Sequence, residues 1–464
     1  MMNLSQMTML VTASLLTACT VGRDYQLPFF ATPDNFIEAA KPEFSNKTIE
    51  LKWWEVFKDG QLSALVNQTI LNNHDLKVAH ANLREARALY MEAGLNLVPT
   101  VTTHSNYTEQ LRSTGSMNNR AFVPRELSLY SAGFDATWEL DLFGRVRRNV
   151  EASNDEVEMQ EASLKEVKIS LIAEVARNYF ELRGLQNQLS VIKQNIENQQ
   201  QTLEITRVRV ENGRGTELDT ARIAAQLDNT RAIIPTLETM IAHAIHRVSV
   251  LTGQLPNALT ENLSKVIAIP TLPETIAVGN PADLLRRRPD IQVVERRLAA
   301  STARIGVATA DLFPKVTFVG TLSLEASTLS SMGAAGSGAY SLGPRISWAA
   351  FDLGRVYARI KAADAHADAD LEKYQQTVLN ALEETENALV SYNKTKEKQD
   401  FLASAVKSSL KAYDLAQLRF NEGMTDFLTV LDSQSRLLQD QNQFAQSQTE
   451  TATKLVAVYK SLGG

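Results

Sequence analysis

The run from Arg355 to Glu422 contains neither glycine nor proline, and it restricts the fold more than any other feature of the sequence. A second run, from Arg145 to Asn212, is interrupted only by Gly184. A continuous helix over either run would be roughly 100 Å long at about 1.5 Å per residue, whereas the mean globular helix has about 11–12 residues. Both runs are rich in Gln, Asn, Lys and Glu, so we expect helices that stand in water rather than in lipid.

Apolar residues recur along the run from Arg355 to Glu422 at spacings of three and four, which is typical of a narrow, coiled-coil-like seam. The seam residues are Val356, Ile360, Ala363, Ala367, Leu371, Tyr374 and Val378. The alternative is an ordinary soluble helical bundle, and the length of the runs argues against it. We also expect Pro235 to kink or break the helix that contains it.

The sequence repeats itself. The Gly-Arg-Val units at Gly144 and Gly354 are 210 residues apart (354 − 144 = 210), and upstream Asp75 and Asp290 are 215 apart (290 − 75 = 215). Colinear matches of this kind indicate a duplicated unit with a five-residue length difference in its middle. Each unit is predicted to contain a helix, two strands, a long helix, a turn and a helix.

The predicted strands alternate apolar and polar residues with a period of two, which is typical of a sheet with one apolar face. The clearest are 127–140 and 316–325, whose even positions are mostly apolar, followed by 340–348. The segment 100–112 is weaker. Pro344 argues against a regular central strand for its segment, because proline cannot donate a ladder hydrogen bond.

The single cysteine, Cys19, follows an apolar segment over residues 7–16 and ends the sequence Leu-Thr-Ala-Cys. This pattern is typical of a bacterial lipobox, in which the thiol receives diacylglycerol and becomes the mature N-terminus. The alternative is an uncleaved leader, since the first six residues carry no Lys or Arg. Thr20, in place of an Asp after the cysteine, favours the outer membrane.

One-sided sheets in a secreted chain suggest a membrane β-barrel, because every backbone polar group in lipid must be paired within the protein. Four strands cannot close a barrel, since known barrels start at about eight, so several chains must contribute to one. Between its ends the sequence has no run of about 18 apolar residues that would form a transmembrane helix. A net charge of −6 excludes a nucleic-acid binder that relies on bulk positive charge, and 44% hydrophobic residues exclude a disordered chain.

Five motifs carry a family resemblance. They are Val21-Gly22-Arg23-Asp24-Tyr25, with Arg23 where Pro is usual, then Trp53-Trp54, residues 140–145, residues 284–290 and residues 428–432. Together they span nearly the whole mature chain, which resembles the lipidated branch of the TolC-type outer membrane factors. The resemblance implies mixed α and transmembrane β structure. It specifies a trimeric twelve-stranded outer-membrane β-barrel continuous with a long periplasmic α-helical barrel, built from two tandem repeats per chain.

The resemblance also implies the function, which is that of an outer membrane channel subunit in a tripartite efflux system. Such a subunit is a passive exit duct for drugs or other small molecules. Its partners would be two further subunits, a periplasmic adaptor, an inner-membrane resistance–nodulation–division pump and outer membrane lipids, with no nucleic acid. It would sit in the outer membrane, extend into the periplasm, and carry no cofactor besides the lipid on Cys19.

We expect four parts along the chain. The first two are a signal peptide over 1–18 and a lipid-anchored extended segment over 19–60. The first repeat covers 61–270, with a hairpin about 98–141 and a tip near 213–216. The second repeat covers 271–464, with a hairpin about 314–352, a tip near 423–426 and an equatorial tail. Gly213 and Gly423 should supply the left-handed conformation that ends the long helices.

The two turns should form the periplasmic tip, where the family closes its aperture. By the motif match, Leu428 would be an apolar constriction and Asp432 would form a ring of three carboxylates that repel one another, share protons or bind a cation. The alternatives are coiled-coil packing for Leu428 and a solvated helix carboxylate for Asp432. Arg222 occupies the position equivalent to Asp432 (432 − 210 = 222), and we predict that it lies within reach of an Asp432 carboxylate in the closed state.

One departure from the family affects the tip. Family members can carry a Tyr whose hydroxyl bonds an Asp on the neighbouring helix pair; here that Tyr is replaced by Phe420, while the Asp matches Asp219. The polar lock is therefore in doubt. Adaptor contacts are expected at Arg209, Asn212, Gly213, Asn421, Glu422 and Gly423, with simple solvation as the alternative.

Two other functions remain as alternatives to the efflux channel. A protein-secretion duct partnered with an ABC exporter would have the same fold, and a lipid-anchored coiled coil without a pore would belong to a different class. No catalytic constellation is present, so an enzyme is not expected. His243 and His246 are three residues apart on a predicted helix, but without a third ligand nearby they are better interpreted as solvated surface than as a metal site.

Overall fold

The computed structural model describes residues 20–45, 47, 50, 52–113, 115 and 124–464. They form two compact units, each drawn from three segments of the chain. Unit 1 consists of the described residues up to Phe29 together with Asn82–Glu161 and Val293–Gln375, and unit 2 of Phe30–Ala81, Ala162–Gln292 and Gln376–Gly464. The predicted signal peptide and Cys19 lie outside the described residues.

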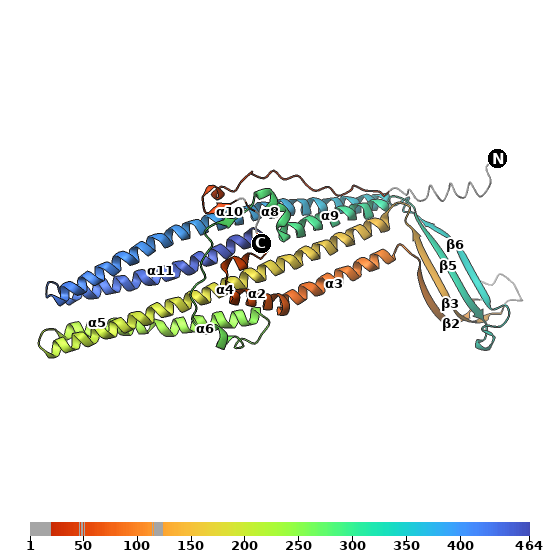
Figure 1. Ribbon diagram of the computed structural model, residues 1–464. Helices are drawn as coiled ribbons and strands as arrows, with labels where there is room; N and C mark the ends of the chain where they lie inside the picture. Colours follow the sequence, from red (N-terminus) through yellow and green to blue (C-terminus); the bar gives the residue numbers. More distant parts are fainter. Residues whose placement is uncertain (1–19, 46, 48–49, 51, 114, 116–123) are drawn as a thin grey trace. The chain divides into compact units, whose positions relative to one another are not determined.

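Unit 1 contains a four-stranded antiparallel sheet (Figure 1). Its order is β2 (Thr100–Leu111), β3 (Glu126–Leu140), β5 (Lys315–Ala326) and β6 (Gly338–Ser347). Each repeat supplies two neighbouring strands, and the β3–β5 pair joins the repeats. Pro344 lies in β6, one of the two edge strands, which is where a strand proline can be accommodated.

The register confirms that the sheet has one apolar and one polar face. On the apolar face, Phe134 lies opposite Leu322 and Trp138 lies opposite Phe318, and all four side chains are exposed. The opposite face carries rows of polar side chains. One such row runs across the sheet through Thr102, Asp135, Thr321 and Ser341. Because side chains alternate along a strand, this arrangement follows directly from the period-two pattern of the sequence.

Both long helices are continuous. They are α4 (Arg145–Glu211) and α10 (Leu353–Asn421), and each begins in unit 1 and ends in unit 2. Along the predicted seam of α10, Val356, Ala367, Tyr374 and Val378 are buried. Unit 1 further contains most of α9 (Pro289–Ala310), part of α3 (His74–Leu95) and η4 (Leu329–Ser331). Among the described residues, we find no helix that combines the length and the apolar character needed to cross a membrane.

Unit 2 holds the remaining elements. They are η1 (Glu38–Ala40), η2 (Trp53–Phe57), α2 (Gly60–Asn72), α5 (Glu217–Arg231), α6 (Ile233–Leu251), α7 (Thr260–Leu263), α8 (Pro281–Arg287), α11 (Phe427–Ser461) and the short parallel pair β1 (Phe44–Ser45) and β4 (Ile276–Ala277). The helix break between α5 and α6 falls at Ala232, three residues before Pro235, as the proline predicts. In the core, the Trp53 ring stacks on Tyr459 with centroids 5.0 Å apart.

The duplication is visible in individual hydrogen bonds as well as in element order. The indole N–H of Trp138 donates to the carbonyl oxygen of Leu97 at 2.9 Å, and that of Trp348 donates to Leu312 at 3.0 Å. The tryptophans are related by the 210-residue offset and the carbonyls by the 215-residue offset. The two halves of the unit 1 sheet therefore bind the turns that follow their preceding helices, α3 and α9, through the same contact.

Candidate functional site

The turn that follows each long helix is closed by the same backbone motif. After α4, the Arg214 N–H donates to the Arg209 carbonyl at 2.8 Å and the Gly213 N–H donates to Val210 at 2.9 Å. These two bonds define a Schellman cap, which needs a left-handed residue. Gly213 supplies it with φ 69°, and Gly423 repeats it after α10 with φ 74°. The predicted role of both glycines is confirmed.

The helices that leave the turns begin with mirrored caps. At the start of α5, the backbone N–H of Asp219 donates to the Thr216 hydroxyl, while the Asp219 carboxylate accepts from the Thr216 hydroxyl at 2.6 Å. At the start of α11 the order of the two groups is reversed, because Asp426 comes first and Thr429 three residues later. The Asp426 carboxylate accepts from the Thr429 backbone N–H at 3.0 Å and from the Thr429 hydroxyl at 2.6 Å. Both arrangements satisfy the free N–H groups of a first turn.

Asp219, which the family resemblance assigns to a polar lock with a tip tyrosine, therefore has a local partner in this chain. Its carboxylate also accepts from the Thr216 backbone N–H at 3.3 Å, so both elements of a capping box are present. Phe420 offers no hydroxyl to compete with this contact. The cap accounts for Asp219 without any lock.

Phe420 instead takes part in an aromatic contact between the two repeats. The Arg209 guanidinium carbon lies 4.1 Å from the centroid of the Phe420 ring, and that ring lies 5.3 Å from the ring of Phe427. A guanidinium over an aromatic face is attracted by the ring quadrupole. The end of α4 is thus held against the end of α10 by a cation–π contact rather than by a hydroxyl–carboxylate bond.

Leu428 and Asp432 lie one turn apart on α11, and both are exposed, with Leu428 at 50%. The equivalent positions on α5 carry Leu218, which is 57% exposed, and the exposed Arg222. Each repeat therefore presents an apolar side chain followed by a charge on one helix face, with opposite signs in the two repeats. Both pairs are therefore open to solvent near the turns that follow α4 and α10.

Arg222 acts within the chain on a different carboxylate from the one predicted. Hydrogen bonds from Thr429 lower the pKa of Asp426 most, and the charge of Arg222 lowers this pKa further. In the part of the chain that the structure describes, Arg222 and Asp432 form no ion pair with each other. The approach of Arg222 to an Asp432 carboxylate in the closed state stays a prediction.

The expected adaptor-contact residues are mostly exposed. Asn212, Gly213, Asn421, Glu422 and Gly423 all face solvent, and the Asn212 amide donates to the Val208 carbonyl at 2.7 Å. Arg209 differs because its guanidinium lies on the Phe420 ring and is partly buried. Five of the six residues are therefore accessible, while Arg209 already has an internal partner.

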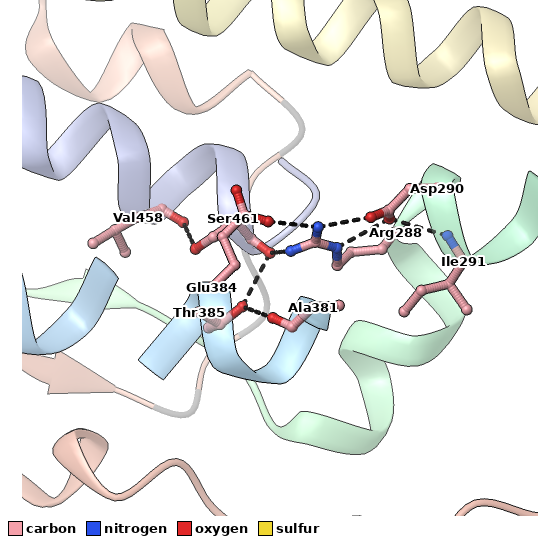
Figure 2. A network of polar contacts seen from close by, with 8 residues as sticks. All are labelled: Arg288, Asp290, Ile291, Ala381, Glu384, Thr385, Val458 and Ser461. Atoms are coloured by element: carbon pink, nitrogen blue, oxygen red, sulfur yellow. Dashed lines mark hydrogen bonds and ion pairs between the residues drawn. The ribbon is translucent and has the colours of Figure 1, made fainter. Parts of the chain in front are cut away.

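The other end of α11 is fixed by Arg288, from the 284–290 motif (Figure 2). Its guanidinium donates to both carboxylate oxygens of Asp290 at 3.0 and 2.7 Å, to Glu384 at 2.6 Å, and to the Ser461 carbonyl at 2.8 Å. Thr385 also donates to the Ser461 carbonyl at 3.2 Å. Arg288 is buried, and its two carboxylate partners raise its pKa despite the desolvation that opposes the charge.

The first repeat uses an amide at the equivalent place. The side-chain N–H of Asn73 donates to the Leu251 carbonyl at 2.9 Å, and the offsets of 215 and 210 residues relate this pair to Arg288 and Ser461. Leu251 ends α6, and Ser461 ends α11. Each repeat thus fastens the end of its returning helix to the start of the helix that leads into its hairpin.

Metal-binding residues do not gather in the part of the chain that the structure covers. Within it, no three or more His, Cys, Asp or Glu side chains come together in a way that could hold a metal ion. His243 and His246 lie on α6 with both side chains exposed. The site features that the sequence reasoning missed are the mirrored caps and the Arg209–Phe420 contact. The caps could have been found from the spacing of Thr216 to Asp219, which is a capping-box pattern.

The family model described as outer membrane efflux protein matches residues 65–254 and 280–464 of this chain. The chain belongs to the outer membrane efflux protein family. Membership confirms the family resemblance carried by the sequence motifs. The matched residues include the four helices that flank the two turns, namely α4, α5, α10 and α11.

Relatives of this efflux protein cover most of its length. It is 30% identical to nodulation protein T of Rhizobium leguminosarum bv. trifolii, over 96% of this chain and 94% of that protein. It is also 30% identical to the pyoverdine export outer membrane protein OpmQ of Pseudomonas putida, over 89% of this chain and 88% of that protein.

Solved structures share the fold. The outer-membrane channel OprN is 41% identical, with a TM-score of 0.89, and the match covers 96% of this chain and 99% of that one. The open-state MtrE outer membrane channel of Neisseria gonorrhoeae is 24% identical, with a TM-score of 0.83 over 96% and 98% of the two chains, which shows the fold alone. The predicted combination of long helices with a membrane-type sheet in two tandem repeats is confirmed.

Proposed function

We propose that this efflux-family protein is the outer membrane channel of a tripartite system. Three copies would form a passive exit duct for drugs or other small molecules, delivered by an inner-membrane pump of the resistance–nodulation–division class through a periplasmic adaptor. The proposal is supported above all by one observation, the four-stranded sheet of unit 1. This sheet has an exposed apolar face and, among the described residues, two edges that pair with no further strand.

The apolar face has aromatic residues at both ends, as expected for a sheet that spans a bilayer. Trp138 and Tyr130 are eight positions apart on β3, or about 26 Å at about 3.3 Å per residue. Tilted by about 40°, such a strand would span most of the roughly 25 Å apolar band of an outer-membrane barrel. Tyr107 pairs with Tyr130 at one end, and Trp348 follows β6 at the other.

The open edges support assembly. Within the described residues, β2 and β6 each pair with a single strand, so each leaves backbone N–H and C=O groups without ladder partners. In lipid these groups must be paired, which requires closure. Three copies give twelve strands, within the range of about 8 to 26 found in outer-membrane barrels. Gly133 supports curvature as well, because a Cβ there would lie 2.6 Å from the Ser323 Cα, and glycines that allow close backbone approach mark bends in barrels.

The tip and the N-terminus complete the proposal. Leu428 and Asp432 would line the aperture, with Arg222 within reach of an Asp432 carboxylate in the closed state. The adaptor would meet Asn212, Gly213, Asn421, Glu422 and Gly423, with Arg209 beside them. Cys19 would carry the lipid that anchors each chain. The exposed Leu–charge pairs on α5 and α11 support the aperture.

Planar-bilayer recording tests the proposal. The purified protein should give discrete single-channel conductance steps and should run as a trimer in native mass spectrometry. A stable monomer without conductance would overturn the channel and favour the lipid-anchored coiled coil. A deletion strain distinguishes the two classes of inner-membrane partner. Greater susceptibility to small toxic compounds supports efflux, whereas loss of a secreted protein with unchanged susceptibility would support a duct for an ABC exporter.

A further inference from the structure

Residues 20–26, called here the strap, lie against the start of α4. The Val21 N–H donates to the Phe143 carbonyl at 3.2 Å. Thr20 lies so close to Gly144 that a Cβ on this glycine, whose φ is 80°, would overlap the Thr20 side chain. The strap therefore begins in contact with the chain immediately after β3, which ends at Leu140.

The strap also crosses α9 at close range. A Cβ on Gly22 would lie 2.6 Å from the Gly306 Cα, and a Cβ on Gly306 would lie 2.8 Å from the Arg148 Cγ. A side chain at Gly22 would therefore overlap the Gly306 backbone, and one at Gly306 would overlap the Arg148 side chain. The pair Gly22 and Gly306 thus lets two backbones touch with the Arg148 side chain beside them.

Arg148 is the centre of this contact. Its side chain is only 4% exposed, and its guanidinium donates to the Asp24 carboxylate at 2.6 Å and the Val21 carbonyl at 3.2 Å in the strap, and to Glu151 at 2.7 Å on its own helix. A buried guanidinium is tolerated only when its N–H groups are paired. Two of these three partners belong to the strap, so Arg148 and the strap depend on each other.

A second anchor follows along the strap. The Arg296 guanidinium carbon lies 5.6 Å from the centre of the Tyr25 ring, and between the anchors Arg23 pairs with Asp364 of α10 at 3.3 Å, with both side chains about half exposed. The strap thus contacts α4 from the first repeat and α9 and α10 from the second. A freely solvated tail would make no such set of contacts.

We propose that Arg148 is a positioning residue that fixes where the lipid anchor enters the membrane. The proposal rests on the proposed lipidation of Cys19. Cys19 directly precedes the docked Thr20 in the sequence, and consecutive Cα atoms are about 3.8 Å apart, so the lipid would join the chain one residue from the foot of β3. The acyl chains then start beside the Trp138 and Trp348 end of the same chain's sheet. The lipid acts there as a fixed contact at the base of the sheet, beyond its role as a tether.

Hydrogen–deuterium exchange on the full-length protein in lipid nanodiscs tests the docking. In Arg148→Ala, peptides that cover residues 20–29 should exchange about tenfold faster or more, because the charged hydrogen bonds that hold the strap are lost. Asp24→Ala should act in the same direction, and because the Asp24 side chain is 82% exposed, its removal leaves the core of the fold intact. Peptides over β2 should be unchanged. Arg87→Ala, which removes an exposed ion pair with Glu161 at 2.7 Å, is the matched control and should leave the strap protected.

The position of the strap is read by a distance measurement. Spin labels on Gln26→Cys, an exposed strap residue, and on Ser347→Cys should give a narrow distance distribution in the otherwise unchanged protein. The distribution should become broad after Arg148→Ala or Asp24→Ala and stay narrow after Arg87→Ala. Equal strap exchange or equally narrow distances in all variants would overturn the proposal. Labelling with radioactive palmitate separates it from the proposed function: an unlabelled parent protein overturns the lipid anchor and this inference together, whereas a labelled protein whose strap ignores Arg148 overturns this inference alone.

Discussion

Arg209 and Phe420 come from different repeats, and their contact is the part of the tip that depends most on single side chains. The guanidinium lies 4.1 Å from the ring centroid, and such contacts contribute about 0.5–2 kcal/mol. We predict that Arg209→Met and Phe420→Leu, which keep volume but remove the attraction, each raise the open probability of single channels several-fold. The double variant should add little to either change. Additive effects in this cycle would show that the two side chains act independently.

Asp155 is the residue at which we expect the clearest pH dependence of stability. It is 8% exposed, and burial raises its pKa to about 6, with Arg296 opposing the rise and Glu158, Glu151 and Glu295 adding to it. A carboxyl whose pKa is raised by folding binds its proton more tightly in the folded state. Its contribution to stability is therefore fully present below the unfolded pKa of about 3.9 and is lost as the pH rises through about 6.

Asp155→Asn should remove that loss. At pH 7.5 we expect a gain of roughly 1–2 kcal/mol in unfolding free energy, since each pKa unit is worth about 1.4 kcal/mol and part of the shift is offset by lost pairing with Arg296. At pH 4 the variant and the parent should be equally stable. Urea unfolding at the two pH values measures the difference, and an equal gain at both would contradict the assignment.

Among the elements, α5 and α11 start with the same two chemical groups in opposite order. Thr216→Ala should lower the stability of unit 2 by about 1 kcal/mol, the usual cost of losing a helix N-cap. The exchange Thr216→Asp with Asp219→Thr converts the first cap into the arrangement of Asp426 and Thr429, and it should be nearly neutral. Thermal unfolding of the parent protein, the Thr216→Ala variant and the double exchange measures these changes in stability. If the double exchange lowered stability as much as Thr216→Ala does, the order of the two groups would matter.

The elements also show what the sequence can predict. The helices α4 and α10 and the faces of β3 and β5 follow from signals that act over a few residues, namely the lack of glycine and proline and the alternation of apolar side chains. The contact of Arg209 with Phe420 could not be predicted, because it joins positions far apart in the sequence whose helical phases are set by packing. Asp219 illustrates a local signal in the sequence: its spacing from Thr216 predicts a cap, while Phe420 in place of Tyr already puts the family's polar lock in doubt.

At the scale of the whole molecule, the duplication preserves backbone positions more than side chains. The carbonyls of Leu251 and Ser461 are bound at equivalent places, one by the amide of Asn73 and the other by the guanidinium of Arg288. Arg288 adds Asp290 and Glu384 to the contact, so the end of α11 is held by charge where the end of α6 is held by an amide. The two halves can thus share a fold while their returning helices differ, one broken at Ala232 and the other continuous over 35 residues.

The orientation of the sheet in the membrane gives the last prediction, and neighbouring residues of β6 provide a matched pair. Leu342 lies on the apolar face opposite Gly320, and Ser341 lies on the polar face opposite Thr321. An arginine on the lipid face of a barrel costs about 2–4 kcal/mol near the midplane, whereas substitutions on the inner face tune selectivity. Leu342→Arg should therefore lower the stability of the membrane-inserted protein by about that amount in urea titrations, while Ser341→Arg should leave it unchanged. In bilayer recordings, Ser341→Arg should shift the reversal potential toward anion selectivity, because it adds a positive charge per subunit to the lumen. If the two substitutions exchanged these effects, the apolar face would line the pore and the proposed barrel would be wrong.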